Sequence, residues 1–138
     1  MSELADIRKK FNEGALDHIK KDLENFITMR REEILNYLND FNKRNPTRQI
    51  DEELAIKFFI LKTRTINAKQ EITEQLREIE REKWIQGVKL QAPPNPVKVA
   101  EDWASKFSPG WRDHRVTIIV FIFDQDKQKY LNLLKGTN

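Results

Sequence analysis

The stretch from Asp51 to Gly87 constrains the fold most, because it joins a helix start, a long periodic run and a helix end. Asp51 is a favourable N-cap, the two glutamates after it complement the positive end of the helix dipole, and Gly87 is typical of the position just past a last turn. The pattern predicts one helix of about 35 residues. At 1.5 Å per residue, this helix would reach about 50 Å.

One face of this segment repeats every seven residues, as the seam of an antiparallel coiled coil does. The seam consists of Leu54, Phe58, Leu61, Thr65, Ala68, Ile72, Gln75 with Leu76, and Ile79. Ile56, Phe59 and Ile60 lie off the seam near its start. We therefore expect that end of the helix to be covered on two sides.

The preceding segment, from about Ser2 to Phe41, is also helical in pattern and must be divided at Gly14. Its apolar residues before Gly14 lie on a face about 130° away from those after it, at about 100° per residue. Pro46 follows the basic residues that end the segment. The two long segments together predict an antiparallel, coiled-coil-like helical hairpin over residues 1–90.

The last third begins with a Pro-rich linker at 91–96, and Asn95 with Pro96 is a start signal for a short helix to about Phe107. The apolar face of this short helix would hold Val97, Ala100, Trp103, Ala104 and Phe107.

Residues 116–123 form the most apolar run, and its lack of alternation leaves strand and helix both open. We favour a helix from about Pro109 to Leu134, because the only candidate partner strand, 84–90, is weak. The alternative is a strand followed by a helix capped at Asp124.

These elements predict an all-α single domain over 1–138, with two further helices in 97–138 packed on the hairpin. Composition agrees, since 34% of the 138 residues are charged and only 4 are glycine. A chain of this length buries enough surface to form a core without disulfides or a structural metal ion.

Several kinds of chemistry are disfavoured by the sequence. The chain has no cysteine, and its four glycines are isolated, so thiolate sites and Gly-rich nucleotide loops are excluded. Ala15 and Trp111 stand three positions before the two histidines, so the Glu-x-x-His pattern of di-iron bundles is absent. We expect no metal, no cofactor and no enzymatic activity; a weak acid-base cluster would be Asp113 and His114 with the carboxylates 101 and 102.

Tryptophan and arginine gather around the start of the apolar run. Trp and Arg dominate many interface hot spots, so this cluster is a candidate partner-binding surface, made of Trp103, Trp111, Arg112, His114 and Arg115. On the alternative interpretation, Trp111 anchors the helix in the core and the charged residues solvate it.

Basic pairs recur along the first segment, and an 11-residue step would place Lys9, Lys20 and Arg31 in one row about 16 Å apart per step. Such a row could meet phosphates if the helix continues through Gly14. Interleaved carboxylates oppose this interpretation, because they favour a face of internal salt bridges.

The sequence therefore predicts a non-enzymatic helical interaction or assembly protein. We expect self-association, because a long hairpin with apolar residues on several faces is hard to cover internally, and a two-fold pair would bury the excess. Another protein is also an expected partner, and nucleic-acid binding through the basic row is the alternative. A cytoplasmic protein without membrane contact is expected, since the first residues do not resemble a signal peptide and 116–123 is too short to span a bilayer.

Overall fold

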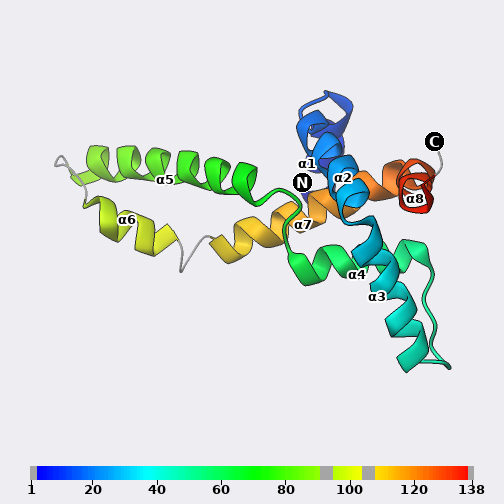
Figure 1. Ribbon diagram of the computed structural model, residues 1–138. Helices are drawn as coiled ribbons and strands as arrows, with labels where there is room; N and C mark the ends of the chain where they lie inside the picture. The colour runs from blue at the N-terminus through cyan, green and yellow to red at the C-terminus, as the bar shows by residue number, and fades with distance from the viewer. Residues whose placement is uncertain (1–2, 91–94, 104–107, 137–138) are drawn as a thin grey trace. The chain divides into compact units, whose positions relative to one another are not determined.

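The computed structural model describes residues 3–90, 95–103 and 108–136, and every regular element in these ranges is a helix (Figure 1). This confirms the all-α prediction for the described residues. In chain order the helices are α1 (Glu3–Asn12), α2 (Asp17–Met29), α3 (Arg31–Arg44), α4 (Glu52–Thr63), α5 (Ala68–Leu90), α6 (Pro96–Asp102), α7 (Ser108–Gln125) and α8 (Lys127–Lys135).

The chain divides into two compact units. The first unit combines residues 1–66 with 116–138, and the second consists of 67–115, so the boundary falls inside α7. The single domain expected from the sequence stays a prediction. Residues 91–94 of the predicted linker lie outside the described residues.

The first helix ends before Gly14 and does not continue through it, a point that the sequence pattern left open. Gly14 has φ of 79°, in the left-handed region that glycine adopts without the penalty a Cβ brings. A second division, which the sequence pattern does not predict, occurs at Arg30, with φ of −102° and ψ of 12°. The Arg30 backbone N–H still donates to the Phe26 carbonyl at 2.9 Å. Three shorter helices therefore occupy the segment predicted to hold one divided helix.

The single long helix predicted between Asp51 and Gly87 is wrong, because the segment forms α4 and α5. Its start is as predicted, since the Asp51 carboxylate accepts the Leu54 backbone N–H at 3.0 Å. However, α4 ends at Thr63, and Arg64 takes a left-handed conformation with φ of 58°.

Local side-chain hydrogen bonds explain this break. The Thr63 hydroxyl donates to the Thr65 carbonyl at 3.1 Å. Four residues further, the Asn67 side-chain oxygen accepts the Gln70 backbone N–H at 3.1 Å and so caps the start of α5. Thr and Asn side chains that bond to nearby backbone compete with helical hydrogen bonds, and here the competition interrupts a run whose apolar periodicity continues.

A shorter hairpin replaces part of the predicted one. Helices α3 and α4 pack through the Tyr37 and Phe59 rings, whose centroids are 6.2 Å apart. The Asn42 carboxamide stabilises the loop between α3 and α4, since it accepts the Ile50 N–H at 2.7 Å and donates to the Ile50 carbonyl at 3.0 Å. The long coiled-coil-like hairpin over 1–90 is not confirmed, because α5 belongs to the second unit.

Residues 116–123 are helical, as favoured over a strand, and form part of α7. The predicted helix to Leu134 is interrupted at Asp126, where φ is −142°. Helix α8 then follows and ends at Gly136, which caps it with φ of 78°.

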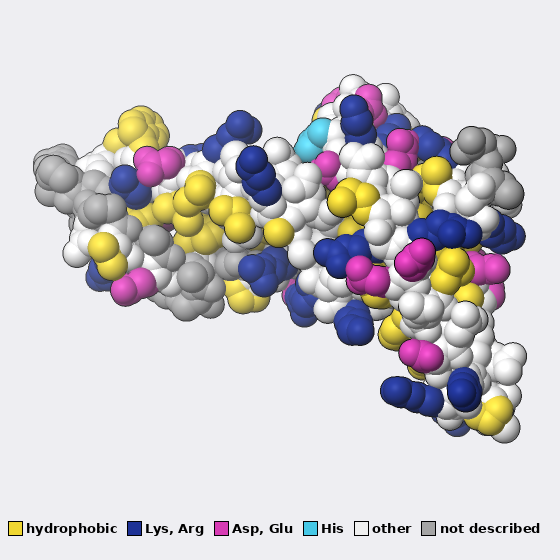
Figure 2. Space-filling model, viewed as in Figure 1, with side chains coloured by type: hydrophobic (Ala, Val, Ile, Leu, Met, Phe, Trp, Pro, Cys, Tyr) yellow, Lys and Arg dark blue, Asp and Glu magenta, His cyan; other side chains and the backbone are white. Residues whose placement is uncertain are grey.

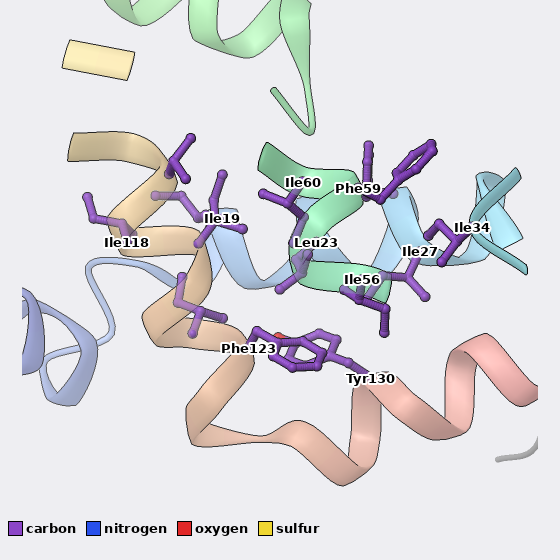
Figure 3. Close-up of a cluster of buried hydrophobic side chains, with 14 of the residues drawn as sticks. Ile19, Leu23, Ile27, Ile34, Ile56, Phe59, Ile60, Ile118, Phe123 and Tyr130 are labelled. Carbon is purple, nitrogen blue, oxygen red and sulfur yellow. The ribbon is translucent and has the colours of Figure 1, made fainter. Parts of the chain in front are cut away.

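The core of the first unit lies where α2, α4, α7 and α8 meet (Figure 3). Leu23, Ile56 and Ile60 have no exposed surface, and the rings of Phe123 and Tyr130 stack with centroids 5.8 Å apart. The apolar run of α7 is therefore a buried element, and its hydrophobicity is explained by the fold.

Candidate functional site

The second unit contains the Trp/Arg cluster that the sequence singles out. Asn95 starts α6 as predicted, because its side-chain oxygen accepts the Val97 backbone N–H at 3.0 Å. The face of α6 differs from the prediction: Val97 is 64% exposed, whereas Val99 is 1% exposed. Trp103 is half-buried, and its indole N–H donates to the Gln75 side-chain oxygen of α5 at 3.2 Å. Ala104 and Phe107 lie outside the described residues.

Arg115 forms an internal contact of this unit. Its side chain is buried and forms an ion pair with Glu74 of α5. Its guanidinium also lies over the Trp111 ring, 5.0 Å from the centroid, a distance suited to a cation–π interaction. Among the five residues of the predicted partner-binding surface, Arg112 alone is exposed, and His114 and Trp111 are half-buried. The structure thus gives Trp103 and Arg115 intramolecular partners on α5.

The predicted basic row does not lie on one helix. Lys9 is in α1, Lys20 is in α2 and Arg31 begins α3, and the chain leaves the helical conformation between them at Gly14 and Arg30. Lys20 is half-buried, 3.2 Å from Asp17 and 4.2 Å from the centroid of the Phe11 ring. The continuous helix that the row requires is absent from the described residues, and nucleic-acid binding stays a prediction.

The most unusual surface of the second unit is an apolar row along α5. Large apolar residues at exposed positions recur at four-residue spacing, interrupted once by Glu80. Their exposed fractions are 57% for Ile72, 56% for Leu76, 71% for Trp84 and 59% for Val88. We call these four residues the α5 row. Hydrophobic side chains are visible at the surface of the region formed by α5 and α6 (Figure 2).

The opposite face of α5 is polar and covered. Glu71 is buried, and Glu74 and Gln75 make the contacts with Arg115 and Trp103 described above. An amphipathic surface helix normally turns its apolar stripe inward. Helix α5 departs from this, because Glu74 and Gln75 contact Arg115 of α7 and Trp103, which follows α6, while the α5 row is exposed.

The charges around the α5 row are mainly positive. Lys69, Arg77 and Arg81 are exposed and lie on a neighbouring row of four-residue spacing whose remaining position is Thr73, and Arg81 lies 3.7 Å from the Glu78 carboxylate. Glu80 is exposed within the row, and its carboxylate lies 3.3 Å from the Lys83 ammonium. A partner at this surface therefore meets apolar side chains edged by basic groups.

A cleft of about 560 Å³ lies between α3 and α4 of the first unit. Tyr37, Phe41 and Phe59 contribute aromatic surface to it, and the Lys62 ammonium lies 5.6 Å from the centroid of the Tyr37 ring. Its rim carries charges of both signs, from Glu33, Asp40, Arg44 and Lys62. This lining suits non-covalent contact with a small amphipathic molecule.

Residues 3–90, 95–103 and 108–136 contain no group of three or more His, Asp or Glu side chains placed to hold a metal ion. None of their helices is both long enough and apolar enough to cross a membrane.

Comparisons with known proteins give no relative: no protein-family model matches the chain, and no curated protein or solved structure is similar to it.

Sequence reasoning missed the α5 row as a surface. Ile72 and Leu76 belong to the predicted seam, whereas Trp84 lies in the predicted helix but off the seam and Val88 lies beyond its predicted end. The four-residue spacing from Ile72 to Val88 is the signal that could have joined them, because residues four apart are neighbours on a helix.

Proposed function

We propose that this protein is a non-enzymatic helical interaction protein that self-associates through the α5 row. The observation that carries the proposal is the outward orientation of four large apolar side chains on one helix whose polar face is covered. Single exposed apolar residues are ordinary, but contiguous apolar surface on a protein marks interaction sites.

The composition of the row supports a protein partner. Trp84 is the most exposed of the four residues, and tryptophan contributes strongly to interface hot spots. Arg77 lies nearby on the same helix, and arginine is likewise enriched at such centres. Isolated charges at the edge of an interface add specificity more than affinity.

Burial of the α5 row sets the expected strength of association. Complete burial of one large apolar side chain stabilises by about 1.5–3 kcal/mol. Each residue of the α5 row is more than half exposed, so its burial in an interface would add somewhat more than half of this stabilisation. Two copies would contribute eight side chains, and the total gain is of the same order as the cost of association, about 4–15 kcal/mol. We therefore expect a dimer that dissociates on dilution.

The test is the mass of the full chain measured by light scattering across a concentration series. The proposal expects the mass to rise from that of one chain toward that of two as concentration increases. A constant monomer mass up to the highest soluble concentration would refute self-association.

A further inference from the structure

We infer that α5 pairs with α5 of a second copy of this chain, antiparallel, about a two-fold axis beside Glu80. This inference rests on the proposed function and adds the partner, the orientation and the register of the interface. It follows from a symmetry in the outward face of α5.

At four distances from Glu80, all on its side of the helix, the residues before and after it match in chemical class. Three positions away both are basic, four away both are large and apolar, seven away both are small, and eight away both are β-branched and apolar. The four pairs are Arg77 with Lys83, Leu76 with Trp84, Thr73 with Gly87, and Ile72 with Val88. An antiparallel two-fold pair places each residue at the level of its match in the other copy. Leu76 of one copy and Trp84 of the other, the apolar residues nearest the axis, then lie at the same level across the interface.

Helix geometry sorts these pairs into centre and rim. Successive residues of a four-residue row turn by about 40° around the helix and rise by about 6 Å. Leu76 and Trp84 therefore lie about 40° to either side of Glu80 and face the partner, while Ile72 and Val88 lie about 80° away at the rim.

Small residues stand where the two backbones come closest. Thr73 and Gly87 lie about 20° from the direction of Glu80, one near each end of the contact. Helix axes approach to 8–10 Å depending on the side chains between them, and small residues at both ends favour the lower part of this range. A tryptophan at the centre can then contact the partner without holding the helices apart at the ends.

The helix dipoles favour the antiparallel orientation over a parallel one, because antiparallel alignment places the positive end of each helix beside the negative end of the other.

The centre of the pair holds both Glu80 carboxylates. Each one lies 3.3 Å from Lys83 of its own helix. In the antiparallel register, Arg77 and Lys83 of both copies lie within about one turn of the axis, so four basic groups surround two carboxylates. Arg77 also comes level with Trp84 of the second copy, where a guanidinium can stack on the indole.

Cysteine cross-linking tests this register, since the natural chain contains no cysteine. The variants are Glu80→Cys at the axis and Thr73→Cys on the same face, with Thr47→Cys, an exposed loop position of the first unit, as the control for random collision. A disulfide needs Cα atoms within about 7 Å. Position 80 meets its own copy across the axis, whereas the two copies of position 73 lie about 21 Å apart along the helices.

The inference expects Glu80→Cys to form disulfide-linked dimers under mild oxidation, and Thr73→Cys to stay at the level of Thr47→Cys. Equal cross-linking of Thr73→Cys and Glu80→Cys would show a parallel pair and overturn the inference. Cross-linking of neither above the control, in proteins that light scattering shows to be dimers when reduced, would place the interface elsewhere and leave the proposed function standing. A natural chain that stays monomeric at every concentration would refute both.

Discussion

Arg31 illustrates how a single side chain takes its role from distant residues. The sequence places it in a basic row, but in the structure its Nε donates to the Leu134 carbonyl at 2.7 Å and its terminal nitrogen to the Lys135 carbonyl at 3.3 Å. The last carbonyls of a helix lack partners within the helix and carry partial negative charge. Arg31 therefore donates hydrogen bonds to the last carbonyls of α8 and links α8 to α3.

We predict that Arg31→Met lowers the free energy of unfolding by about 1.5 kcal/mol, because hydrogen bonds to charged groups contribute about 1.5–3 kcal/mol. The neighbouring Arg30 supplies the matched control. Its two 3.1 Å contacts with Glu33 are exposed, and exposed pairs contribute about 0–1 kcal/mol. Urea unfolding of both variants checks the difference, and equal losses would contradict the role assigned to Arg31.

Tyr130 gives the first unit a dependence on alkaline pH. Burial raises the pKa of Tyr130 well above its usual value of 10, and the negative charges of Glu24 and Asp126 raise it further. In the unfolded chain this hydroxyl loses its proton near pH 10, while in the folded chain it keeps it. Its contribution to stability is therefore present below pH 10 and is lost as the pH rises above 10.

The predicted result is a fall in unfolding free energy that steepens above pH 10, by up to about 1.4 kcal/mol per pH unit from this group. The pKa of Lys57 is also raised, by its hydrogen bond to Asp124, and Lys57 loses stabilising charge in a similar range. Tyr130→Phe separates the two groups, since it removes only the tyrosine. Urea unfolding between pH 8 and 11 should show a shallower fall for Tyr130→Phe, and identical profiles would contradict this assignment.

At the scale of elements, the sequence predicted boundaries that depend on a local signal. Gly14 divides the first segment, Asp51 starts α4 and Asn95 starts α6, because each acts through its own backbone or its own side-chain oxygen. The break at 63–67 was missed because Thr and Asn compete only weakly with a helix, and the apolar periodicity on both sides favours continuity. The predicted length of the hairpin was wrong for the same reason.

The face that α5 turns outward could not be predicted for a different reason. Periodicity shows that Ile72 and Leu76 share a face, but it does not show what lies opposite that face. The covering contacts come from Trp103 and Arg115, which are separated from their partners on α5 by long stretches of sequence. The sequence alone therefore does not show which face of α5 is covered and which is exposed.

Two glycines give opposite predictions for the same substitution. Gly14→Ala places a Cβ in a left-handed conformation and 3.3 Å from the Asp17 carboxylate, so we predict a loss of about 1 kcal/mol or more. Gly110→Ala places a Cβ in open space within α7, and alanine is the better helix former, so we predict a gain of up to about 1 kcal/mol. Thermal unfolding of the two variants checks the signs. A gain for Gly14→Ala would contradict the backbone argument.

In the whole molecule, folding of the first unit and association of two chains depend on different residues. The first unit has a buried core from α2, α4, α7 and α8, and nothing about the α5 row contributes to it. The second unit places its polar contacts inside and its apolar row outside. Substitutions in the row should therefore change association while leaving helix content unaltered, unlike substitutions in the core.

The most direct measurement compares Leu76→Glu with Leu61→Glu by sedimentation or light scattering, at a concentration where the natural chain is a dimer. Both leucines are similarly exposed, 56% for Leu76 and 53% for Leu61, and they receive the same charge. The account predicts that Leu76→Glu yields a monomer with unchanged helical circular dichroism, while Leu61→Glu remains a dimer. A dimer of undiminished stability in Leu76→Glu would show that the α5 row is not the surface through which the chain assembles.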